Sequence, residues 1–151
     1  MIGIIGAVVE EAEAIKKEIK EIKETVISGI SFFTGKFNDK DVVFVQSGIG
    51  KVNAAITATL LIEKFKVSEV IFSGVAGSLD ERLKVGDVVI GHDIVQHDVD
   101  ATAFGYKMGQ IPQMKEWAFE SDKELVEKAG NINDFDHRIF FGRILTGDQF
   151  V

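Results

Sequence analysis

Residues 41–65 have the sequence DVVFVQSGIGKVNAAITATLLIEKF. The first part, Asp41 to Gln46, is rich in β-branched and aromatic residues, which is typical of a strand. The last part, Val52 to Phe65, is rich in Ala, Leu and Ile and predicts a helix. Gly48 and Gly50 separate the two and allow a tight turn. A strand, a glycine turn and a helix in succession are the building unit of an α/β protein.

The same alternation continues on both sides of this stretch. Further strands are expected at 2–5, 31–37, 69–73, 87–95 and 139–145, and helices at 10–23 and at 121–129 with Ser121 as N-cap. The segment Asn38-Asp39-Lys40 joins two strands in a hairpin-like connection. The order predicts a single α/β domain over residues 1–151, with a mixed sheet covered by helices on both faces. A long irregular stretch, 97–117, is expected to be functional or to lie at an interface.

Composition excludes several classes of function. The net charge is −7, with 24 acidic and 17 basic residues, and no arginine precedes Arg82. A nucleic-acid partner is therefore not expected, because such proteins gather Lys and Arg against phosphates. No apolar run approaches about 18 residues, so no membrane span is expected. The absence of cysteine and a first segment without positive charge favour a cytoplasmic protein.

Three glycine-containing turns follow predicted strands, at Gly6, at Gly48/Gly50 and at Gly74/Gly77. They match neither the dinucleotide fingerprint nor the P-loop, whose spacings differ. Taken singly, each turn is explained equally well by the need for a tight strand-to-helix connection. Taken together, they predict a ligand pocket, because ligands of open α/β sheets bind at the carboxyl ends of strands.

A series of motifs then identifies a family. In order along the chain these are GIIGA (3–7) followed by Glu10-Glu11, SGIGKVNAA (47–55), GVAG (74–77), VGDVV (85–89), HDVDATAFGY (97–106) with GQIP (109–112), and TGDQFV (146–151). The series resembles the 5'-methylthioadenosine/S-adenosylhomocysteine nucleosidases of the nucleoside phosphorylase superfamily. The resemblance implies a nucleoside phosphorylase-like, three-layer αβα sandwich around a mixed sheet, with the C-terminal portion missing from residues 1–151.

The resemblance also assigns residues to a site. Glu11 matches the carboxylate that activates water, and it is preferred to Glu10 and Glu13. Phe150 matches the aromatic ring that stacks on adenine, the backbone of Val151 binds the purine edge, and Ile49 lines the pocket for the 5'-thio substituent. Further substrate contacts are implied for Val8, Val75, Ala76 and Gly77. A homodimer is implied because Ala101, Phe104, Tyr106 and Pro112 match residues that cover the neighbouring subunit's pocket.

The implied reaction is hydrolysis of the N-glycosidic bond of 5'-methylthioadenosine and S-adenosylhomocysteine, which releases adenine in methionine salvage. A carboxylate suits attack by water, whereas attack by phosphate needs arginine clamps. Aminofutalosine hydrolysis remains an alternative. A catalytically inactive chain is another, because the family's Met-Glu ribose clamp and purine-protonating Asp have no counterpart in 1–151. No cofactor and no metal are expected, since the spacing of His92, Asp93, His97, Asp98 and Asp100 fits no ligand template.

Overall fold

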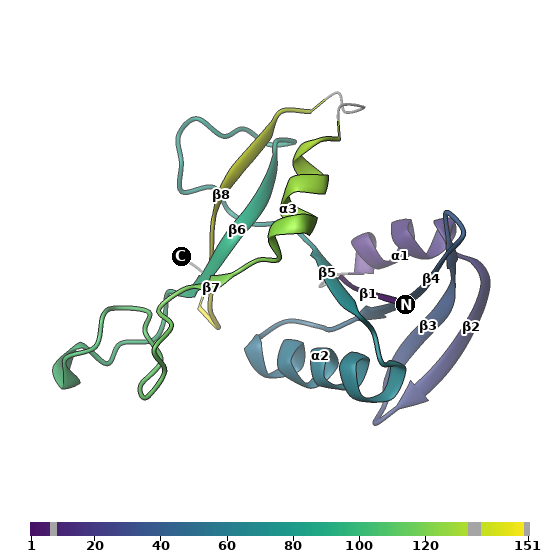
Figure 1. Cartoon of the computed structure of the whole chain (residues 1–151), viewed down its shortest axis with the longest axis horizontal. Helices are drawn as coiled ribbons and strands as arrows, with labels where there is room; N and C mark the ends of the chain where they lie inside the picture. Colours follow the sequence, from purple (N-terminus) through teal and green to yellow (C-terminus); the bar gives the residue numbers. More distant parts are fainter. Residues whose placement is uncertain (7–8, 133–136, 150–151) are drawn as a thin grey trace. The chain divides into compact units, whose positions relative to one another are not determined.

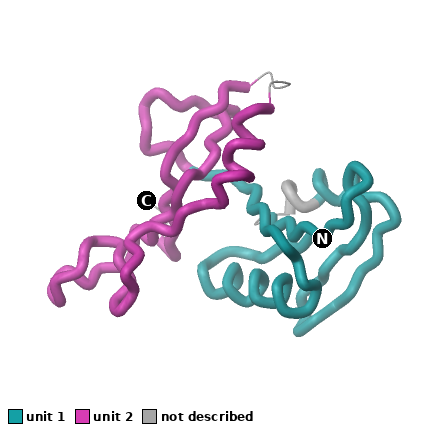
Figure 2. Tube along the Cα trace, viewed as in Figure 1, with its two compact units in different colours: residues 1–76 teal, residues 77–151 magenta. Residues whose placement is uncertain are grey.

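The computed structural model describes residues 1–6, 9–132 and 137–149, with the backbone alone at 9–12. The chain mixes helices and strands, and several strands follow one another without a helix between them (Figure 1). They form two compact units, residues 1–76 and residues 77–151 (Figure 2). The strands accordingly fall into two sheets, one in each unit.

The first unit is built on a five-stranded mixed sheet in the order β2-β3-β4-β1-β5. Its parallel strands are β1 (Ile2–Gly6), β4 (Lys40–Gln46) and β5 (Glu69–Ser73), and its antiparallel strands are β2 (Lys20–Ile27) and β3 (Ile30–Phe37). In the turn between β3 and β4, both Asn38 and Asp39 have positive φ, 46° and 62°. That backbone is typical of the two-residue turns that match the twist of a hairpin. The predicted hairpin is confirmed.

Two helices cover the two faces of this sheet, α1 (Val9–Glu18) and α2 (Lys51–Phe65). Side chains of a strand point alternately to opposite faces of the sheet, and the side chains of β4 follow this rule. Val43 and Val45 pack with Leu61 of α2, whereas Val42 and Phe44 pack with Ile19 at the end of α1. Each fully buried side chain of this size contributes about 1.5–3 kcal/mol. The expected α/β class, a mixed sheet between helices, is confirmed.

The helix expected to reach Lys23 ends instead at Glu18, and β2 follows at once. The prediction of a longer helix was wrong because Ile15, Ile19 and Ile22 recur at helical spacing in the sequence, although the last two lie beyond the helix. Ile19 is buried, but Ile22 is 44% exposed. β2 is one of the two edge strands of this sheet, and its lysines and glutamates suit an edge that must not pair with another chain. Strand pairing with β3 therefore decides the structure of this segment.

The second unit has a three-stranded sheet in the order β7-β6-β8. The strands β6 (Val88–Gln96) and β8 (Ile139–Thr146) are parallel, and the short β7 (Phe119–Glu120) is antiparallel to β6. Helix α3 (Lys123–Gly130) begins at Asp122, whose carboxylate accepts a hydrogen bond from the Leu125 N–H at 3.0 Å. The predicted N-cap, Ser121, is therefore wrong by one residue. The carboxylate of Asp122 is the better acceptor at a helix N-terminus.

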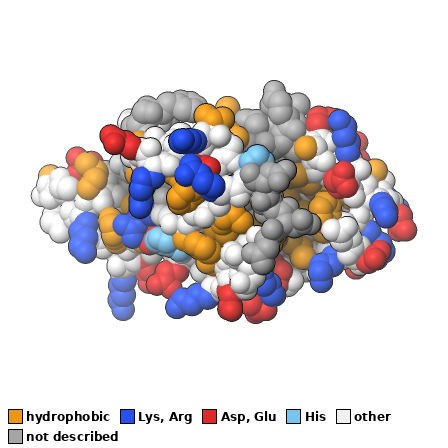
Figure 3. All heavy atoms as spheres, turned by 90° about the horizontal axis from the view of Figure 1, so that it is seen from above, with side chains coloured by type: hydrophobic (Ala, Val, Ile, Leu, Met, Phe, Trp, Pro, Cys, Tyr) orange, Lys and Arg blue, Asp and Glu red, His pale blue; other side chains and the backbone are white. Residues whose placement is uncertain are grey.

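Between β6 and β7 the chain is irregular, as expected, apart from the 3-10 helix η1 (Thr102–Phe104). On the face drawn in Figure 3, basic and acidic side chains are mixed. Among the described residues, no helix combines the length and apolar composition needed to cross a lipid bilayer.

Candidate functional site

The carboxyl ends of the parallel strands meet at one edge of the first unit's sheet. Gly6 at the end of β1 is in register with Gln46 of β4 and with Ser73 of β5. The connection is continued by a hydrogen bond from the Ser47 N–H to the Gly6 carbonyl, at 3.0 Å. The three glycine turns therefore start from the same edge of this sheet, and the ligand pocket expected there stays a prediction. Ligands of parallel α/β sheets bind at this edge.

The conformation of the middle turn, Ser47 to Gly50, depends on two glycines and on one side-chain hydrogen bond. Gly48 and Gly50 have φ of 76° and 99°, a region that side chains other than glycine rarely adopt. The Asn53 side chain donates a hydrogen bond to the Ile49 carbonyl at 2.7 Å. The Ile49 side chain is left 67% exposed. An apolar side chain presented to solvent on a fixed turn suits an apolar part of a ligand.

The turns on either side carry other residues that the resemblance assigns. Glu11 lies in the first turn of α1, directly after β1, where the helix dipole favours a carboxylate. The side chain of Glu11 and the whole of Val8 lie outside the described residues. Val75 and Ala76 follow β5 and are exposed. The structure thus gathers the starting points of these turns at one edge of the first unit.

The remaining assigned residues belong to the second unit. There the parallel strands β6 and β8 end in register at Gln96 and Thr146, and the His97 N–H donates to the Thr146 carbonyl at 2.9 Å. Gly77, the first residue of this unit, is exposed. Phe150 and Val151 follow β8 and lie outside the described residues. The two strand ends nevertheless form a second carboxyl edge, from which the loop at 97–117 and the segment after Thr146 both begin.

The loop at 97–117 presents its assigned residues unequally. Ala101 is buried, whereas Phe104 is 82% exposed and Pro112 is also exposed. Tyr106 is partly buried, and its hydroxyl accepts a hydrogen bond from the Gln113 N–H at 3.2 Å. The ring of Phe104 is more exposed than the other large apolar side chains of this loop, Met108 at 53% and Met114 at 37%.

All three arginines are bound to aspartates. Arg143 donates two hydrogen bonds to Asp93, at 2.6 and 2.7 Å, Arg138 donates to Asp87, and Arg82 donates to Asp80. These hydrogen bonds hold the pKa of Asp87 and Asp93 below the ordinary value and lower that of Asp80 to about 2.

The sequence interpretation missed the two pairs that join distant segments, Arg143–Asp93 and Arg138–Asp87. A signal for the first existed, because Asp93 and Arg143 are register partners once β6 and β8 are aligned.

The carboxylates considered for a metal each have a protein partner. Asp93 binds Arg143, Asp98 accepts from the Asp148 N–H at 2.8 Å, and Asp100 accepts from both N–H and hydroxyl of Thr102 at 3.0 and 2.7 Å. The Thr102 hydroxyl is the main cause of the lowered pKa of Asp100. These aspartates therefore act as structural acceptors.

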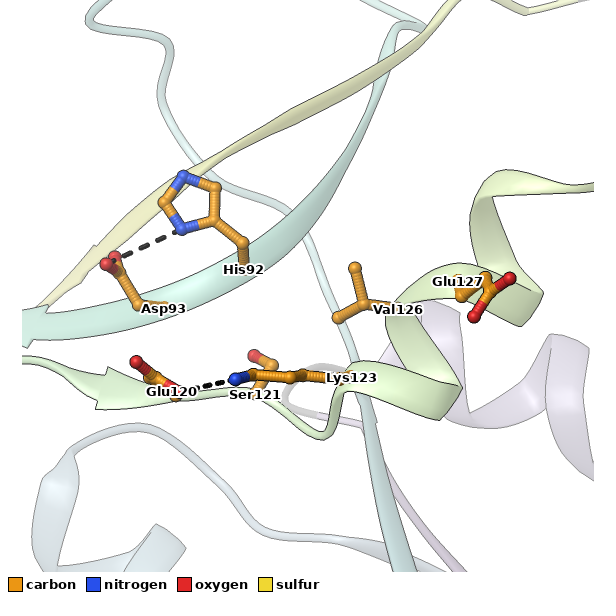
Figure 4. A pocket seen from close by; sticks show the side chains of 7 residues that line it. All are labelled: His92, Asp93, Glu120, Ser121, Lys123, Val126 and Glu127. Carbon is orange, nitrogen blue, oxygen red and sulfur yellow. Dashed lines mark ion pairs between the residues drawn. The ribbon is translucent and has the colours of Figure 1, made fainter.

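A cavity of about 350 Å³ lies in the second unit between β6, β7 and α3 (Figure 4). Two pairs of its lining side chains lie close together, His92 at 3.5 Å from Asp93 and Lys123 at 3.6 Å from Glu120, and Glu127 adds a further carboxylate. The described residues that the resemblance assigns to the substrate do not line it.

Comparison with known families decides where this architecture belongs. The model of the phosphorylase superfamily matches residues 1–151. The chain belongs to the phosphorylase superfamily. Within it, the 5'-methylthioadenosine/S-adenosylhomocysteine nucleosidase of Staphylococcus haemolyticus is 51% identical over 152 residues, which cover 100% of this chain and 66% of that protein. The enzyme of the same name from Staphylococcus aureus strain JH9 is 50% identical with the same coverage. The chain thus spans 66% of the length of these relatives.

Solved structures of the superfamily agree. The 5'-methylthioadenosine/S-adenosylhomocysteine nucleosidase of Neisseria meningitidis, in complex with methylthio-immucillin-A, matches with a TM-score of 0.93 and 40% identity, over 99% of this chain and 65% of that one. A futalosine hydrolase mutant of Helicobacter pylori matches with a TM-score of 0.92 and 37% identity, over 99% and 69%. The nucleoside phosphorylase-like fold expected from the motifs is confirmed by these neighbours.

Proposed function

We propose that this chain belongs to an N-glycosidase that hydrolyses 5'-methylthioadenosine and S-adenosylhomocysteine and releases adenine. The names of its relatives and the ordered motifs support this substrate class. The observation that carries the choice of water over phosphate is the pairing of all three arginines with aspartates. A phosphate nucleophile needs cationic donors that are free to clamp it. Here each guanidinium is already held by a carboxylate.

The proposed roles follow the chemistry of glycoside cleavage. Glu11 orients and deprotonates the water that attacks the anomeric carbon of an oxocarbenium-like ribose. Phe150 stacks on the adenine ring and the Val151 backbone binds its edge, while Ile49 contacts the 5'-thio substituent. Val8, Val75, Ala76 and Gly77 complete the substrate contacts. The family's ribose clamp and purine acid have no counterpart in 1–151, so we propose the full reaction for a chain that also carries the relatives' remaining third.

Aminofutalosine hydrolysis is the second candidate, and the likeness to the Helicobacter pylori futalosine hydrolase supports it. That substrate has a larger 5' substituent on the same adenosine core, so both reactions use the same purine site. The two candidates differ at the pocket for the 5' substituent, where Ile49 is proposed to lie. Relative turnover of 5'-methylthioadenosine and aminofutalosine by one enzyme preparation therefore ranks them.

A homodimer is proposed because Phe104 and Pro112, two of the residues assigned to a neighbouring subunit's pocket, are exposed. An apolar ring that is 82% exposed is a suitable contact for a partner surface. Sedimentation equilibrium of the chain, with Phe104→Ser as the comparison, tests this proposal.

Cytoplasmic localisation is proposed from the composition, which contains no cysteine.

The activity is tested with a chimera in which residues 1–151 are followed by the C-terminal third of the Staphylococcus haemolyticus relative. The chimera is incubated with 5'-methylthioadenosine, with and without phosphate, in water enriched in oxygen-18. We expect adenine release without phosphate and label on the anomeric hydroxyl of the methylthioribose. Release that requires phosphate, with formation of a sugar phosphate, would show a phosphorylase. A folded chimera that releases no adenine would contradict the proposed function.

A further inference from the structure

We propose that Asp98 is a positioning residue for purine binding, because it fixes the segment 147–149, which directly precedes Phe150 in the sequence. The inference deepens the proposed function and rests on it, because the role of Phe150 comes from there. Asp98 itself contacts no substrate in this proposal. It acts through the backbone of the segment that follows β8.

The first observation is the hydrogen bond across the two strand ends. β6 and β8 end together, and the last backbone bond between them runs from the His97 N–H to the Thr146 carbonyl, at 2.9 Å. The pairing of β6 with β8 ends at this point. The Asp98 carboxylate continues the connection by accepting from the Asp148 N–H at 2.8 Å. A carboxylate that accepts from a backbone N–H makes one of the stronger hydrogen bonds in proteins.

The second observation is the close approach at Gly147. A Cβ at this position would overlap the His97 ring and would lie 2.9 Å from the carboxyl carbon of Asp98. The backbone at 147 is thus seated directly on these two side chains. A larger residue at 147 would push the segment away from them. Asp98 therefore fixes the segment both by a hydrogen bond and by contact.

Asp100 provides a matched comparison within the same motif. It lies two residues after Asp98, and its carboxylate accepts from the Thr102 N–H and hydroxyl at 3.0 and 2.7 Å. Those bonds hold the start of η1, which leads to the exposed Phe104. Two aspartates of one short motif therefore hold two different segments. Removing Asp100 should disturb the loop at 97–117 and leave the segment after β8 in place.

Loss of the hydrogen bond between Asp98 and Asp148 should weaken the binding of adenine. Phe150 follows Asp148 by two residues in the sequence, so loss of the anchor at Asp148 should weaken the purine contact that the proposed function gives to Phe150. A ligand that binds only the correctly placed state binds more weakly in proportion to the loss of that state. Asp98→Asn keeps an acceptor oxygen but loses the charge, so it should restore part of the effect of Asp98→Ala.

The test compares Asp98→Ala, Asp98→Asn and Asp100→Ala in the chimera that carries the C-terminal third of the Staphylococcus haemolyticus relative, using NMR exchange of the Asp148 amide and calorimetric binding of adenine alone. In Asp98→Ala we expect amide exchange to be faster by about tenfold or more and the adenine Kd to rise by a similar factor. Asp98→Asn should lie between Asp98→Ala and the unmodified chimera. Asp100→Ala should leave Asp148 exchange unchanged. Thermal unfolding of each variant shows whether its fold is retained.

The outcomes separate the inference from the proposed function. Unchanged Asp148 exchange in Asp98→Ala, or the same acceleration in Asp100→Ala, would overturn the anchoring role. Faster exchange with an unaltered adenine Kd would overturn the link from anchor to purine. If the unmodified chimera does not bind adenine, the purine site of the proposed function fails, and the exchange measurement still decides whether Asp98 holds the segment.

Discussion

Replacing Thr57 by Val should stabilise the first unit. Thr57 lies on the inner side of α2, and its side chain is fully buried, at 0% exposure. Its hydroxyl oxygen has no hydrogen-bond partner within the described part of the chain. A hydroxyl group that leaves water without a new partner is a cost to the folded state. Valine has the same branched shape and carries a methyl group in place of that hydroxyl.

The expected gain follows from this burial. An unsatisfied buried polar group costs about 1–3 kcal/mol, and a methyl group in its place adds favourable apolar burial. Because the pocket was shaped by a hydroxyl, part of the gain is lost to imperfect fit. We therefore expect Thr57→Val to raise the free energy of unfolding by about 1–2 kcal/mol. With a urea slope of about 2 kcal/mol/M, the midpoint should rise by about 0.5–1 M.

The assay is urea unfolding followed by two signals. Far-UV circular dichroism reports both units, whereas fluorescence of Trp117, the only tryptophan, reports the second unit. Thr57→Ala is the control, because it removes the hydroxyl and also leaves a void, so it should gain less than Thr57→Val or lose stability. A loss of more than about 0.5 kcal/mol in Thr57→Val would refute the reasoning, since it would mean that the hydroxyl makes a favourable hydrogen bond.

Three further predictions concern the ion pairs and the exposed turn. Asp87 and Asp93 have a lowered pKa because arginines donate hydrogen bonds to them. These two ion pairs stabilise the folded state fully above the unfolded pKa of about 3.9, and this stabilisation is lost as pH falls through the lower folded pKa. The urea midpoint followed by Trp117 fluorescence should therefore drop below pH 4. A midpoint that does not change with pH in this range would contradict the prediction. Arg143→Lys removes the guanidinium, which donates two hydrogen bonds to Asp93 and lies 4.5 Å from the centre of the Trp117 ring. It should cost about 1–2 kcal/mol in the same unfolding assay, and an unchanged midpoint would refute the pair's contribution. Ile49→Ala should change the free energy of unfolding by less than about 0.5 kcal/mol because the side chain is 67% exposed. In the chimera it should raise the KM for 5'-methylthioadenosine, and an unaltered KM would remove Ile49 from the pocket.

The sequence predicted those parts of the fold that local pattern determines. The apolar runs of β1, β4 and β5 and the glycine turns after them were found at nearly the observed bounds. Parallel pairing then places their ends together, as the register at Gly6 shows. The family motifs identified the superfamily because they occur in order along the chain.

Contacts between distant segments could not be predicted in the same way. The end of α1 depends on pairing of β2 with β3, which a helical pattern through Ile22 does not show. The pairing of Arg143 with Asp93 requires the alignment of strands separated by the loop at 97–117. Asp98 and Asp148 likewise meet only because β6 and β8 end in register. Each of these features depends on tertiary structure rather than on local sequence.

The most direct test of the account is the rate of adenine release from 5'-methylthioadenosine by the chimera and by its Glu11→Gln variant. General base catalysis contributes about 10²–10⁴ in rate, so Glu11→Gln should lower kcat by at least about a hundredfold. Glu10→Gln is the matched control and should stay within about tenfold of the unmodified chimera. Release by Glu11→Gln within about tenfold of the unmodified rate, or a collapse in Glu10→Gln instead, would contradict the assignment of Glu11 as the residue that activates water.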